Sequence, residues 1–268
     1  MELLFSPLFS GSSGNCTYVG SRDAGVIVDC GVSATSALSQ LNEAHISPGA
    51  VKAVLVTHEH TDHIGGAGVL ARKLSVPLYA TQGTWEGGLG KRAGKLDPSQ
   101  IRVISPFEDF FVGDMNVMAF PTPHDCLEPC GFGFTLGSLR AAIATDIGYV
   151  NSKWLDAVEG ADLVLLEADY DEDMLLAGSY PYDLKMRIRG RRGHLSNEDA
   201  GRAAAHLVSK GTRQIILGHL SKNNNFPELA EETCEGILFE HGIRAGRDVG
   251  LSVAKRDSLT GVFRIAEN

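Results

Sequence analysis

The sequence predicts an α+β fold with two sheets packed face to face and helices on the outside. Short runs rich in Val, Ile and Phe, bounded by Gly, Pro, Asp or Ser, dominate the first two-thirds of the chain and are typical of strands. Helical patterns interleave with these runs, so that each strand-rich half is followed by helices, as in layered α and β structures. No Pro- and Ser-rich linker, low-complexity tract or repeat interrupts the chain, and we expect one domain over residues 1–268.

The strand and helix patterns follow one another in a regular order. We expect strands at 3–8, 16–19 and 25–29, a helix at 33–44, a strand at 53–57 and a helix at 64–74. Further strands are predicted at 107–112, 116–120, 131–136 and 140–144, then a helix at 151–158 and a buried strand at 162–167. The Ser-Asn-Glu-Asp sequence at 196–199 is typical of a helix start. It predicts a helix at 196–210, followed by a strand at 214–217, a helix at 227–240 and a strand at 246–254.

Composition restricts the class of protein. Of the 268 residues, 43% are hydrophobic, which is enough for a sizeable core, and no apolar run is long enough to cross a membrane. The net charge of −9 argues against a protein that coats nucleic acid without specificity, but it leaves room for a local basic groove. The first residues lack the basic segment of a signal peptide, and the five cysteines are an odd number, thinly spread. We therefore expect a cytoplasmic protein with reduced thiols and no membrane contact.

The strongest chemical signal is the sequence His58-Glu59-His60-Thr61-Asp62-His63, which directly follows an apolar strand. Imidazole and carboxylate are the ligands that borderline divalent metals prefer. A tight loop leaving the strand can gather these side chains, with Asp62 and His63 at the mouth of the next helix directed to a second metal position. Glu59 is expected to point the other way. The alternative is a polar loop with surface histidines, which fits a single histidine better than this cluster.

Further ligands are expected at other strand ends, because metal sites gather residues that are distant in sequence. His124, Asp146 and His219 each follow an apolar run, so all three can collect along one sheet edge. Three other histidines stand in or beside helical patterns and are expected at the surface; they are His45, His206 and His241.

This ordered set of residues resembles the five-part signature of the metallo-β-lactamase superfamily over nearly the whole chain. The resemblance implies a four-layer αββα sandwich with two metals in a groove along one edge. It also implies that Asp29, which ends its own strand, supports the histidine loop. By the same resemblance, the first metal is held by His58, His60 and His124, the second by Asp62, His63 and His219, and Asp146 bridges the two.

Two metals bridged by a carboxylate would hold a hydroxide suited to in-line attack on a phosphorus or carbonyl centre. The superfamily hosts many reactions, so the fold alone does not choose among them. Asp146 argues against β-lactamases, many of which have Cys at that place. Glu167, at the end of a buried strand, and His194, in Gly-His-Leu-Ser, resemble the nuclease branch. That resemblance implies that Glu167 orients His194 to protonate the leaving oxygen. Otherwise Glu167 is a helix-cap acceptor and His194 a loop residue.

A basic segment lies between these two residues. Five of the eight residues at 185–192 are Lys or Arg, in a protein that is acidic overall. Such a segment would form a positive flank suited to a phosphate backbone. The alternative is a solvated run of charges without a partner.

The longer pattern resembles the bacterial WalJ/YycJ-type group through the Ser-Gly-Ser-Ser-Gly-Asn sequence at 10–15 and the Gly-His-Leu-Ser sequences at 193–196 and 218–221. The resemblance implies a DNA exonuclease that works from 5′ ends, with Asp62, Glu167 and His194 as catalytic residues. Residues expected to contact the substrate are Ser12, Ser13, Asn15, Lys185, Arg187, Arg191, Ser196, Asn197, Ser221 and Asn223.

Other functions stay open at this point. They are a small-molecule metallo-hydrolase for a thioester, lactone or cyclic phosphodiester, an RNA-processing nuclease, and a binding module without activity. The expected cofactors are two divalent ions, Zn²⁺ or Mn²⁺, with Fe²⁺ also compatible with the ligands, and no organic cofactor. The expected partner is nucleic acid, in the form of DNA ends, and the oligomeric state is open. Cys126 and Cys130 are interpreted as loop and strand thiols, because one C-x₃-C pair is weak evidence for a site.

Overall fold

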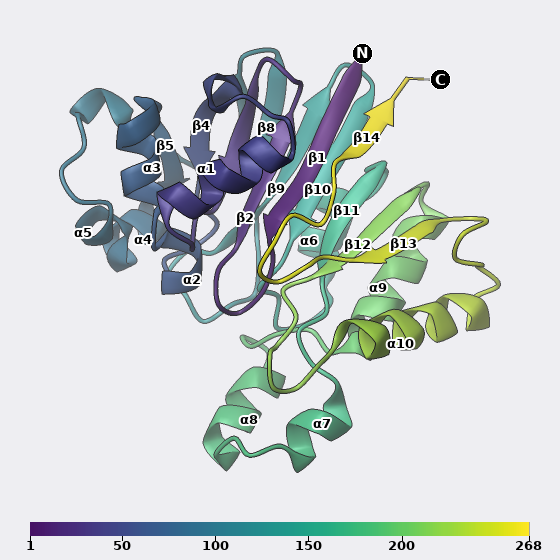
Figure 1. Ribbon diagram of the computed structural model, residues 1–268. Coiled ribbons are helices and arrows are strands. Elements are labelled where there is room, and N and C mark those ends of the chain that lie inside the picture. The colour runs from purple at the N-terminus through teal and green to yellow at the C-terminus, as the bar shows by residue number, and fades with distance from the viewer. Residues whose placement is uncertain (268) are drawn as a thin grey trace. The chain divides into compact units, whose positions relative to one another are not determined.

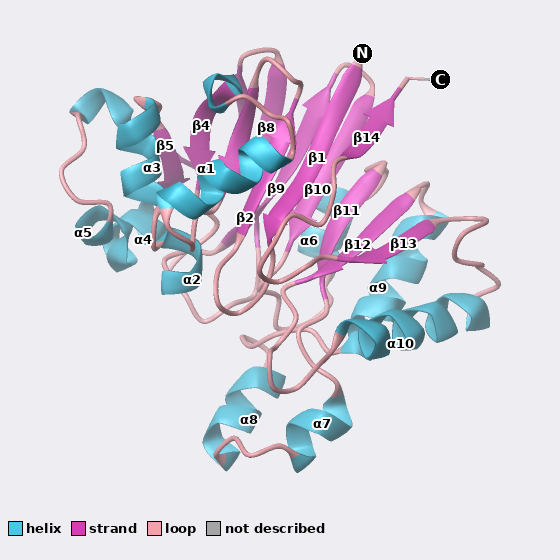
Figure 2. Cartoon of the chain, in the orientation of Figure 1, coloured by secondary structure: helices cyan, strands magenta, loops and turns pink. Residues whose placement is uncertain are grey.

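The computed structural model describes residues 1–267, whose strands and helices are labelled in Figure 1 and coloured by type in Figure 2. The described residues divide into two units. The first unit contains Met1–Pro121, Cys126–Leu139 and residues 255–267, and the second contains Thr122–Asp125 and Arg140–Ala254. The single domain expected over residues 1–268 stays a prediction.

The first unit contains a mixed sheet with the strand order β14-β1-β2-β3-β4-β5-β6. Strands β14, β1, β2 and β3 pair antiparallel, whereas β3, β4, β5 and β6 pair parallel. The central strands β2 and β3 are buried along their whole length, as their apolar sequences require. The strands are β1 (Glu2–Phe9), β2 (Cys16–Gly20), β3 (Gly25–Val28), β4 (Val51–Leu55), β5 (Leu78–Thr81), β6 (Ile101–Ile104) and β14 (Phe263–Ala266).

Helices α1 (Ala34–Glu43) and α3 (Ala67–Leu74) pack against this sheet. Their apolar faces share one buried cluster with strand residues, including Leu41 of α1, Leu70 of α3 and Val54 of β4. Helix α1 begins where the Ser33 hydroxyl accepts a hydrogen bond from the backbone N–H of Ser36. The unit also contains short helical turns at η1 (Pro48–Ala50), α2 (Thr61–Ile64), α4 (Gln82–Thr84), η2 (Trp85–Leu89), α5 (Gly90–Arg92) and η3 (Pro98–Gln100). Its other strands form an antiparallel ladder of β7 (Asp109–Val112), β8 (Met115–Pro121) and β9 (Cys130–Leu136).

The second unit is built on parallel strands β10 (Leu139–Ala144), β11 (Leu163–Glu167), β12 (Gln214–Gly218) and β13 (Gly250–Val253), paired in that order. Every residue of β11 is buried, which explains its continuous apolar sequence. Helices α9 (Asn197–Ser209) and α10 (Pro227–Glu240) pack against each other and against these strands, and α6 (Ser152–Val158) packs on α9. Helices α7 (Glu172–Ala177) and α8 (Tyr182–Arg189) lie beside each other in the segment between β11 and α9 (Figure 1). None of the helices in the described part of the chain is long and apolar enough to span a membrane.

Several elements differ from the sequence prediction. The prediction missed β5, β6, β14, α7 and α8, because the strands have four residues each and α8 has no buried residue to mark an apolar face. The helix predicted at 64–74 is present, but it begins later, at Ala67, after the separate turn α2 that ends at Ile64. The break lies where the N–H of Gly66 donates to the Cys30 carbonyl at 2.6 Å, and a Cβ at Gly66 would lie 2.1 Å from the Val32 oxygen. The strand predicted at 246–254 shortens to β13, since Gly246 has a φ of 77°.

Three residues of the predicted metal site and its support stand just after buried strands. Asp29 follows β3, Asp146 follows β10 and His219 follows β12, each with left-handed backbone (φ 57°, 59° and 59°). Residues other than Gly adopt this conformation uncommonly, with Asn, Asp and His the most frequent among them, and strained backbone of this kind clusters at functional sites. In each case it turns the chain sharply at the end of a buried strand.

Candidate metal centre

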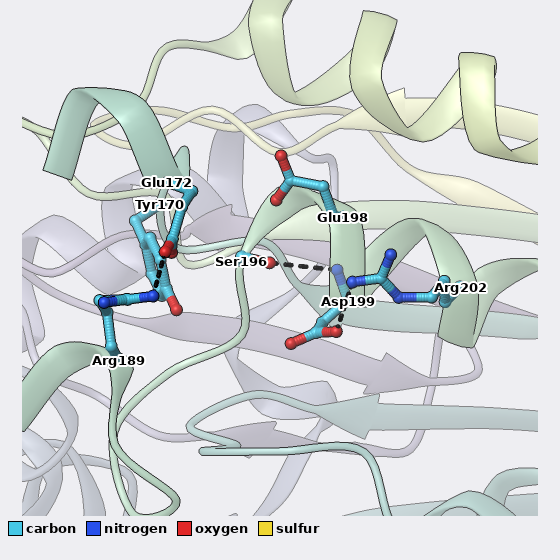
Figure 3. A pocket seen from close by; sticks show the side chains of 7 residues that line it. All are labelled: Tyr170, Glu172, Arg189, Ser196, Glu198, Asp199 and Arg202. Carbon is cyan, nitrogen blue, oxygen red and sulfur yellow. Dashed lines mark hydrogen bonds and ion pairs between the residues drawn. The ribbon is translucent and has the colours of Figure 1, made fainter. Parts of the chain in front are cut away.

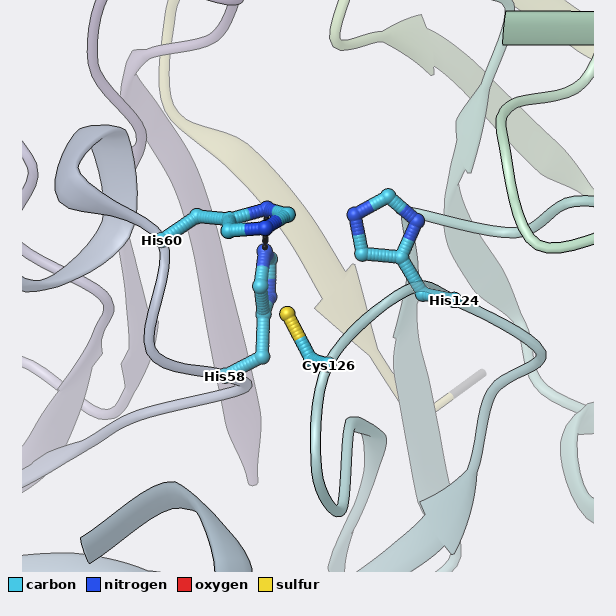
Figure 4. Close-up of side chains that lie close together, drawn as sticks. All are labelled: His58, His60, His124 and Cys126. Atoms are coloured by element: carbon cyan, nitrogen blue, oxygen red, sulfur yellow. Dashed lines mark hydrogen bonds between the residues drawn. The ribbon is translucent and has the colours of Figure 1, made fainter. Parts of the chain in front are cut away.

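The loop after β4 in the first unit gathers the four ligands predicted from the first motif. His58 and His63 are buried, with ring centroids 4.1 Å apart. His58 Nε2 lies 3.1 Å from His60 Nδ1, and His63 Nε2 lies 3.4 Å from Asp62 Oδ2 (Figure 4 shows His58 and His60). The motif therefore forms two adjacent donor pairs, His58 with His60 and Asp62 with His63. Glu59 points elsewhere, as predicted, and its Oε1 accepts the N–H of Leu127 at 2.9 Å.

Asp29 supports this loop from the end of β3. Its carboxylate accepts hydrogen bonds from the Thr57 N–H at 2.9 Å and the Thr57 hydroxyl at 2.8 Å. The same carboxylate lies 2.8 Å from His63 Nδ1. With Nδ1 of His63 donating to Asp29, Nε2 is left as the acceptor, which is the arrangement that orients a histidine for metal binding. The supporting role implied for Asp29 is thus the one its contacts show.

The second unit gathers the other three predicted ligands. Asp146 Oδ1 lies 3.6 Å from His124 Nε2 and 3.5 Å from His219 Nε2. The remaining ring nitrogens contact protein groups: His124 Nδ1 lies 2.9 Å from the Gly193 carbonyl and His219 Nδ1 lies 3.2 Å from Glu167 Oε1. The Nε2 atoms of His124 and His219 therefore face the same carboxylate, and the contacts at their Nδ1 atoms orient both rings.

Glu167 and His194 form a buried pair within the same cluster. Glu167 is fully buried, and its Oε2 accepts the N–H groups of Ile147 at 2.8 Å and Leu195 at 3.1 Å. Its Oε1 lies 2.8 Å from His194 Nδ1. The His194 side chain is 20% exposed, and its ring stacks on that of His219 with centroids 5.3 Å apart. The structure thus supports orientation of His194 by Glu167 rather than a helix-cap role for Glu167.

The charges of this cluster compensate one another. Burial raises the pKa of Glu167, but His194 outweighs this effect and the pKa falls to about 2. Burial lowers the pKa of His194, yet Asp169 and Glu167 raise it to about 9. Burial, together with the charges of Glu167 and Asp146, raises the pKa of Asp169 to about 6 against the opposing histidines. Burial lowers the pKa of His124. Buried carboxylates and imidazoles at this density are donors of the type that divalent cations bind.

The donor sets fit divalent metal ions in both units. In the first unit, ligand atoms of Asp62 and His63 lie close together, as do those of His58 and His60. In the second unit, one ligand atom from each of Asp146, Glu167, His194 and His219 lies within 4.8 Å of the others. Oxygen and nitrogen donors at these spacings suit Zn²⁺, Mn²⁺ or Fe²⁺.

The residues predicted to contact the substrate differ in exposure and in hydrogen-bond partners. Asn15 Nδ2 lies 3.1 Å from His63 Nε2, beside the predicted ligands, while Ser12 and Ser13 are exposed in the turn after β1. Asn197 is fully buried, and its side-chain amide pairs with that of Asn225. The hydroxyl of Ser221 accepts the N–H of Asn224, and Asn223 donates to the Tyr180 hydroxyl. Their roles in substrate binding stay predictions.

The basic segment at 185–192 finds partners within the second unit. Lys185 donates to the Leu176 carbonyl, Arg187 pairs with Asp125 at 2.5 Å, and Arg191 lies over the Tyr149 ring. Ser196 caps α9 through the Asp199 N–H and lines a pocket of about 390 Å³ (Figure 3). The two arginines that line this pocket, Arg189 and Arg202, are each paired with a carboxylate. The Arg187 side chain is 57% exposed.

Three features of the cluster were missed by the sequence reasoning. Asp169 is buried and its Oδ1 lies 3.8 Å from His219 Nδ1; its position two residues after Glu167 at a strand end was an available signal. Cys126 has its sulfur beside His58 and His60 (Figure 4), and no local pattern marks that contact. The pairing of Asn197 with Asn225 joins the start of α9 to the loop after β12.

Comparison with known proteins agrees with this architecture. The chain is 38% identical over 262 residues to Exodeoxyribonuclease WalJ of Streptococcus pneumoniae serotype 2, covering 97% of each chain. It is 38% identical over 246 residues to Exodeoxyribonuclease YycJ of Bacillus anthracis, covering 92% of this chain and 93% of the relative. The resemblance to the WalJ/YycJ-type group is therefore confirmed.

Solved structures show the same fold. The metallo-beta-lactamase fold protein YhfI from Bacillus subtilis matches with a TM-score of 0.73 at 18% identity, over 99% of this chain and all of that one. Zn²⁺-bound PqqB from Methylobacterium extorquens matches with a TM-score of 0.72 at 18% identity, over the whole of both chains. The predicted α+β sandwich class is confirmed. Residues 25–220 match the family model described as "Beta-lactamase superfamily domain", and the chain belongs to this superfamily.

Proposed function

We propose that this protein is a metal-dependent exonuclease that degrades DNA from 5′ ends in the cytoplasm. In this proposal the metal ligands are those of the superfamily signature, with His58, His60 and His124 for one ion, Asp62, His63 and His219 for the other, and Asp146 for both. The order of these residues along the chain matches the superfamily signature, and both curated relatives carry the name exodeoxyribonuclease. PqqB, which has the same fold, binds Zn²⁺.

Bound metals of this kind would supply an activated water and neutralise negative charge on the phosphate. The chain's own residues orient the ligands. Asp29 holds His63 through Nδ1, the Gly193 carbonyl holds His124 and Glu167 contacts His219. Zn²⁺ or Mn²⁺ would occupy this centre, with Fe²⁺ also compatible, because imidazole and carboxylate suit all three.

The observation that favours phosphodiester cleavage is the Glu167–His194 pair. An alkoxide is a poor leaving group, so its departure benefits from a positioned general acid. Glu167 holds Nδ1 of His194 at 2.8 Å, and the ring is partly exposed, which leaves Nε2 to deliver a proton to the leaving oxygen. A lactone or thioester hydrolase has less need of this pair.

Digestion of a 5′-phosphorylated, end-labelled DNA strand with added Mn²⁺ or Zn²⁺ tests the proposal. We expect stepwise release of mononucleotides from the 5′ end, and loss of that release in the Asp146→Ala variant. A matched RNA strand and a 3′-labelled DNA strand determine the substrate and the direction. Metal-loaded, folded protein that cleaves neither nucleic acid would favour a small-molecule hydrolase instead.

Substitutions in the basic segment separate DNA binding from chemistry. Replacing Arg187 and Arg191 with Gln should weaken DNA cleavage most at low salt and make it less dependent on salt, because each lost cation removes a phosphate contact. Cleavage of a chromogenic phosphodiester too small to reach the segment should stay unchanged. Equal losses on both substrates would show that this segment does not bind the DNA backbone.

A further inference from the structure

A thiol lies beside the first pair of histidines in the first unit. Cys126 is 6% exposed, and its sulfur and one ring nitrogen each of His58 and His60 lie within 4.8 Å of one another. In Figure 4 the sulfur points towards the ring of His58. The two imidazoles present Nε2 of His58 and Nδ1 of His60 to each other at 3.1 Å. Ligand atoms in a tetrahedral zinc site lie roughly 3.3–3.7 Å apart, so small side-chain movements would bring all three atoms to one ion.

The backbone that follows Cys126 is tied to the histidine loop at the residues on either side of His58. The N–H of Leu127 donates to the Glu59 carboxylate at 2.9 Å, and the N–H of Cys130 donates to the Thr57 carbonyl at 3.0 Å. The Glu128 carboxylate accepts the N–H of Gly83 at 2.8 Å, which anchors the middle of the segment. These bonds hold the segment from Cys126 to Cys130 against residues 57–60. The position of the sulfur therefore follows from the fold of the unit rather than from a mobile loop.

The other thiol of the C-x₃-C pair is placed differently. Cys130 is 1% exposed at the start of β9, and its Sγ–H donates to the Thr57 carbonyl at 3.4 Å. It belongs to none of the potential metal-binding groups found among the described residues. The Cys126 thiol thus lies beside two imidazoles, whereas the Cys130 thiol contacts a backbone carbonyl. Cys130 therefore provides a matched control for Cys126.

We propose that Cys126 is a thiolate ligand of the metal held by His58 and His60, which makes this position selective for zinc over manganese. The inference rests on the metal centre proposed above and adds a donor to it. Thiolate is a soft ligand that favours Zn²⁺, whereas Mn²⁺ prefers carboxylate and water oxygen. A metal site that includes a thiolate therefore differs in selectivity from one with imidazole and carboxylate alone.

Cobalt substitution provides a direct test, because Co²⁺ reports its ligands by absorption. Protein stripped of metal and titrated with Co²⁺ should show a thiolate-to-cobalt charge-transfer band in the near ultraviolet, together with the visible bands of a tetrahedral ion. The Cys126→Ser variant should keep the visible bands and lose the charge-transfer band, whereas Cys130→Ser should keep both. Cobalt bound without a charge-transfer band in the unaltered protein, or with the band retained in Cys126→Ser, would overturn the thiolate assignment. Failure of the unaltered protein to bind Co²⁺ would refute the metal centre as well.

Metal competition gives a second readout that does not depend on activity. We expect Cys126→Ser to lower Zn²⁺ affinity at least about tenfold, a loss typical of a disturbed metal site, and to change Mn²⁺ affinity by less than about twofold. Titration against a chromophoric chelator measures both, and thermal unfolding of the two serine variants checks that they fold alike. An equal loss of Zn²⁺ and Mn²⁺ affinity would refute the selectivity.

Discussion

Replacing Glu167 with Gln tests the proton donor most sharply. The side chain is fully buried, and its carboxylate contacts Nδ1 of His194 at 2.8 Å while accepting two backbone N–H groups. Glutamine keeps the shape but has one acceptor oxygen. If that oxygen keeps the backbone donors, the amide NH₂ faces Nδ1 of His194, which must then be the acceptor. The positive form of His194 loses its partner, and its ability to donate from Nε2 falls.

The size of the effect follows from these contacts. A general acid contributes about 10²–10⁴ to the rate, so single-turnover cleavage of DNA should fall by about 10²–10³. Loss of a buried, charge-assisted hydrogen bond should also cost about 1.5–3 kcal/mol in the free energy of unfolding. A phosphodiester with a p-nitrophenolate leaving group needs little protonation, and its cleavage should fall by less than about tenfold.

Comparing the cleavage rates of DNA and of the p-nitrophenyl ester tests whether His194 is the general acid. A matched control is Glu159→Gln, which alters another Glu–His pair, with His206 Nε2 at 2.6 Å, away from the cluster. That variant should cleave both substrates at the unaltered rate. If Glu167→Gln slowed DNA and the p-nitrophenyl ester by the same factor, Glu167 would act on the metal ligands and the assignment of His194 as the acid would fail.

Two further predictions concern the histidine loop. Asp29→Asn should lower Zn²⁺ affinity by about 10–100-fold, because the carboxylate that orients His63 is lost. The control variant Asp23→Asn, in the exposed turn before β3, should bind Zn²⁺ as the unaltered protein does. Competition with a chelator measures both affinities, and equal values for the two variants would show that Asp29 does not support the site. Gly31→Ala should destabilise the protein by at least about 3 kcal/mol, because its Cβ would lie 1.6 Å from the Asp62 carbonyl oxygen. Gly236→Ala, in α10 with no atom within 4 Å of the added Cβ, should instead stabilise it by about 1 kcal/mol. Thermal and urea unfolding compare these variants, and a Gly31→Ala protein as stable as the unaltered one would contradict the close packing of the two loops.

Much of the candidate site could be predicted because its residues carry local signals. His58, His124, Asp146 and His219 each follow an apolar run within a few residues, and strand ends are where a layered fold exposes side chains. Glu167 ends a buried strand in the same way. The elements missed are those without such a signal: β5 and β6 have four residues each, and α8 buries none of its residues.

The sequence by itself determined the kind of donors, their order and the family, because metal-binding side chains are recognised by type and spacing. It could not determine which distant groups meet them. The sulfur of Cys126 lies beside His58 because hydrogen bonds from Leu127 and Cys130 join two loops that are far apart in the chain. Likewise, Asn197 faces Asn225 in the interior, although its sequence context resembles a substrate-binding motif. Burial and hydrogen-bond partners belong to the folded chain, and only the tertiary structure decided them.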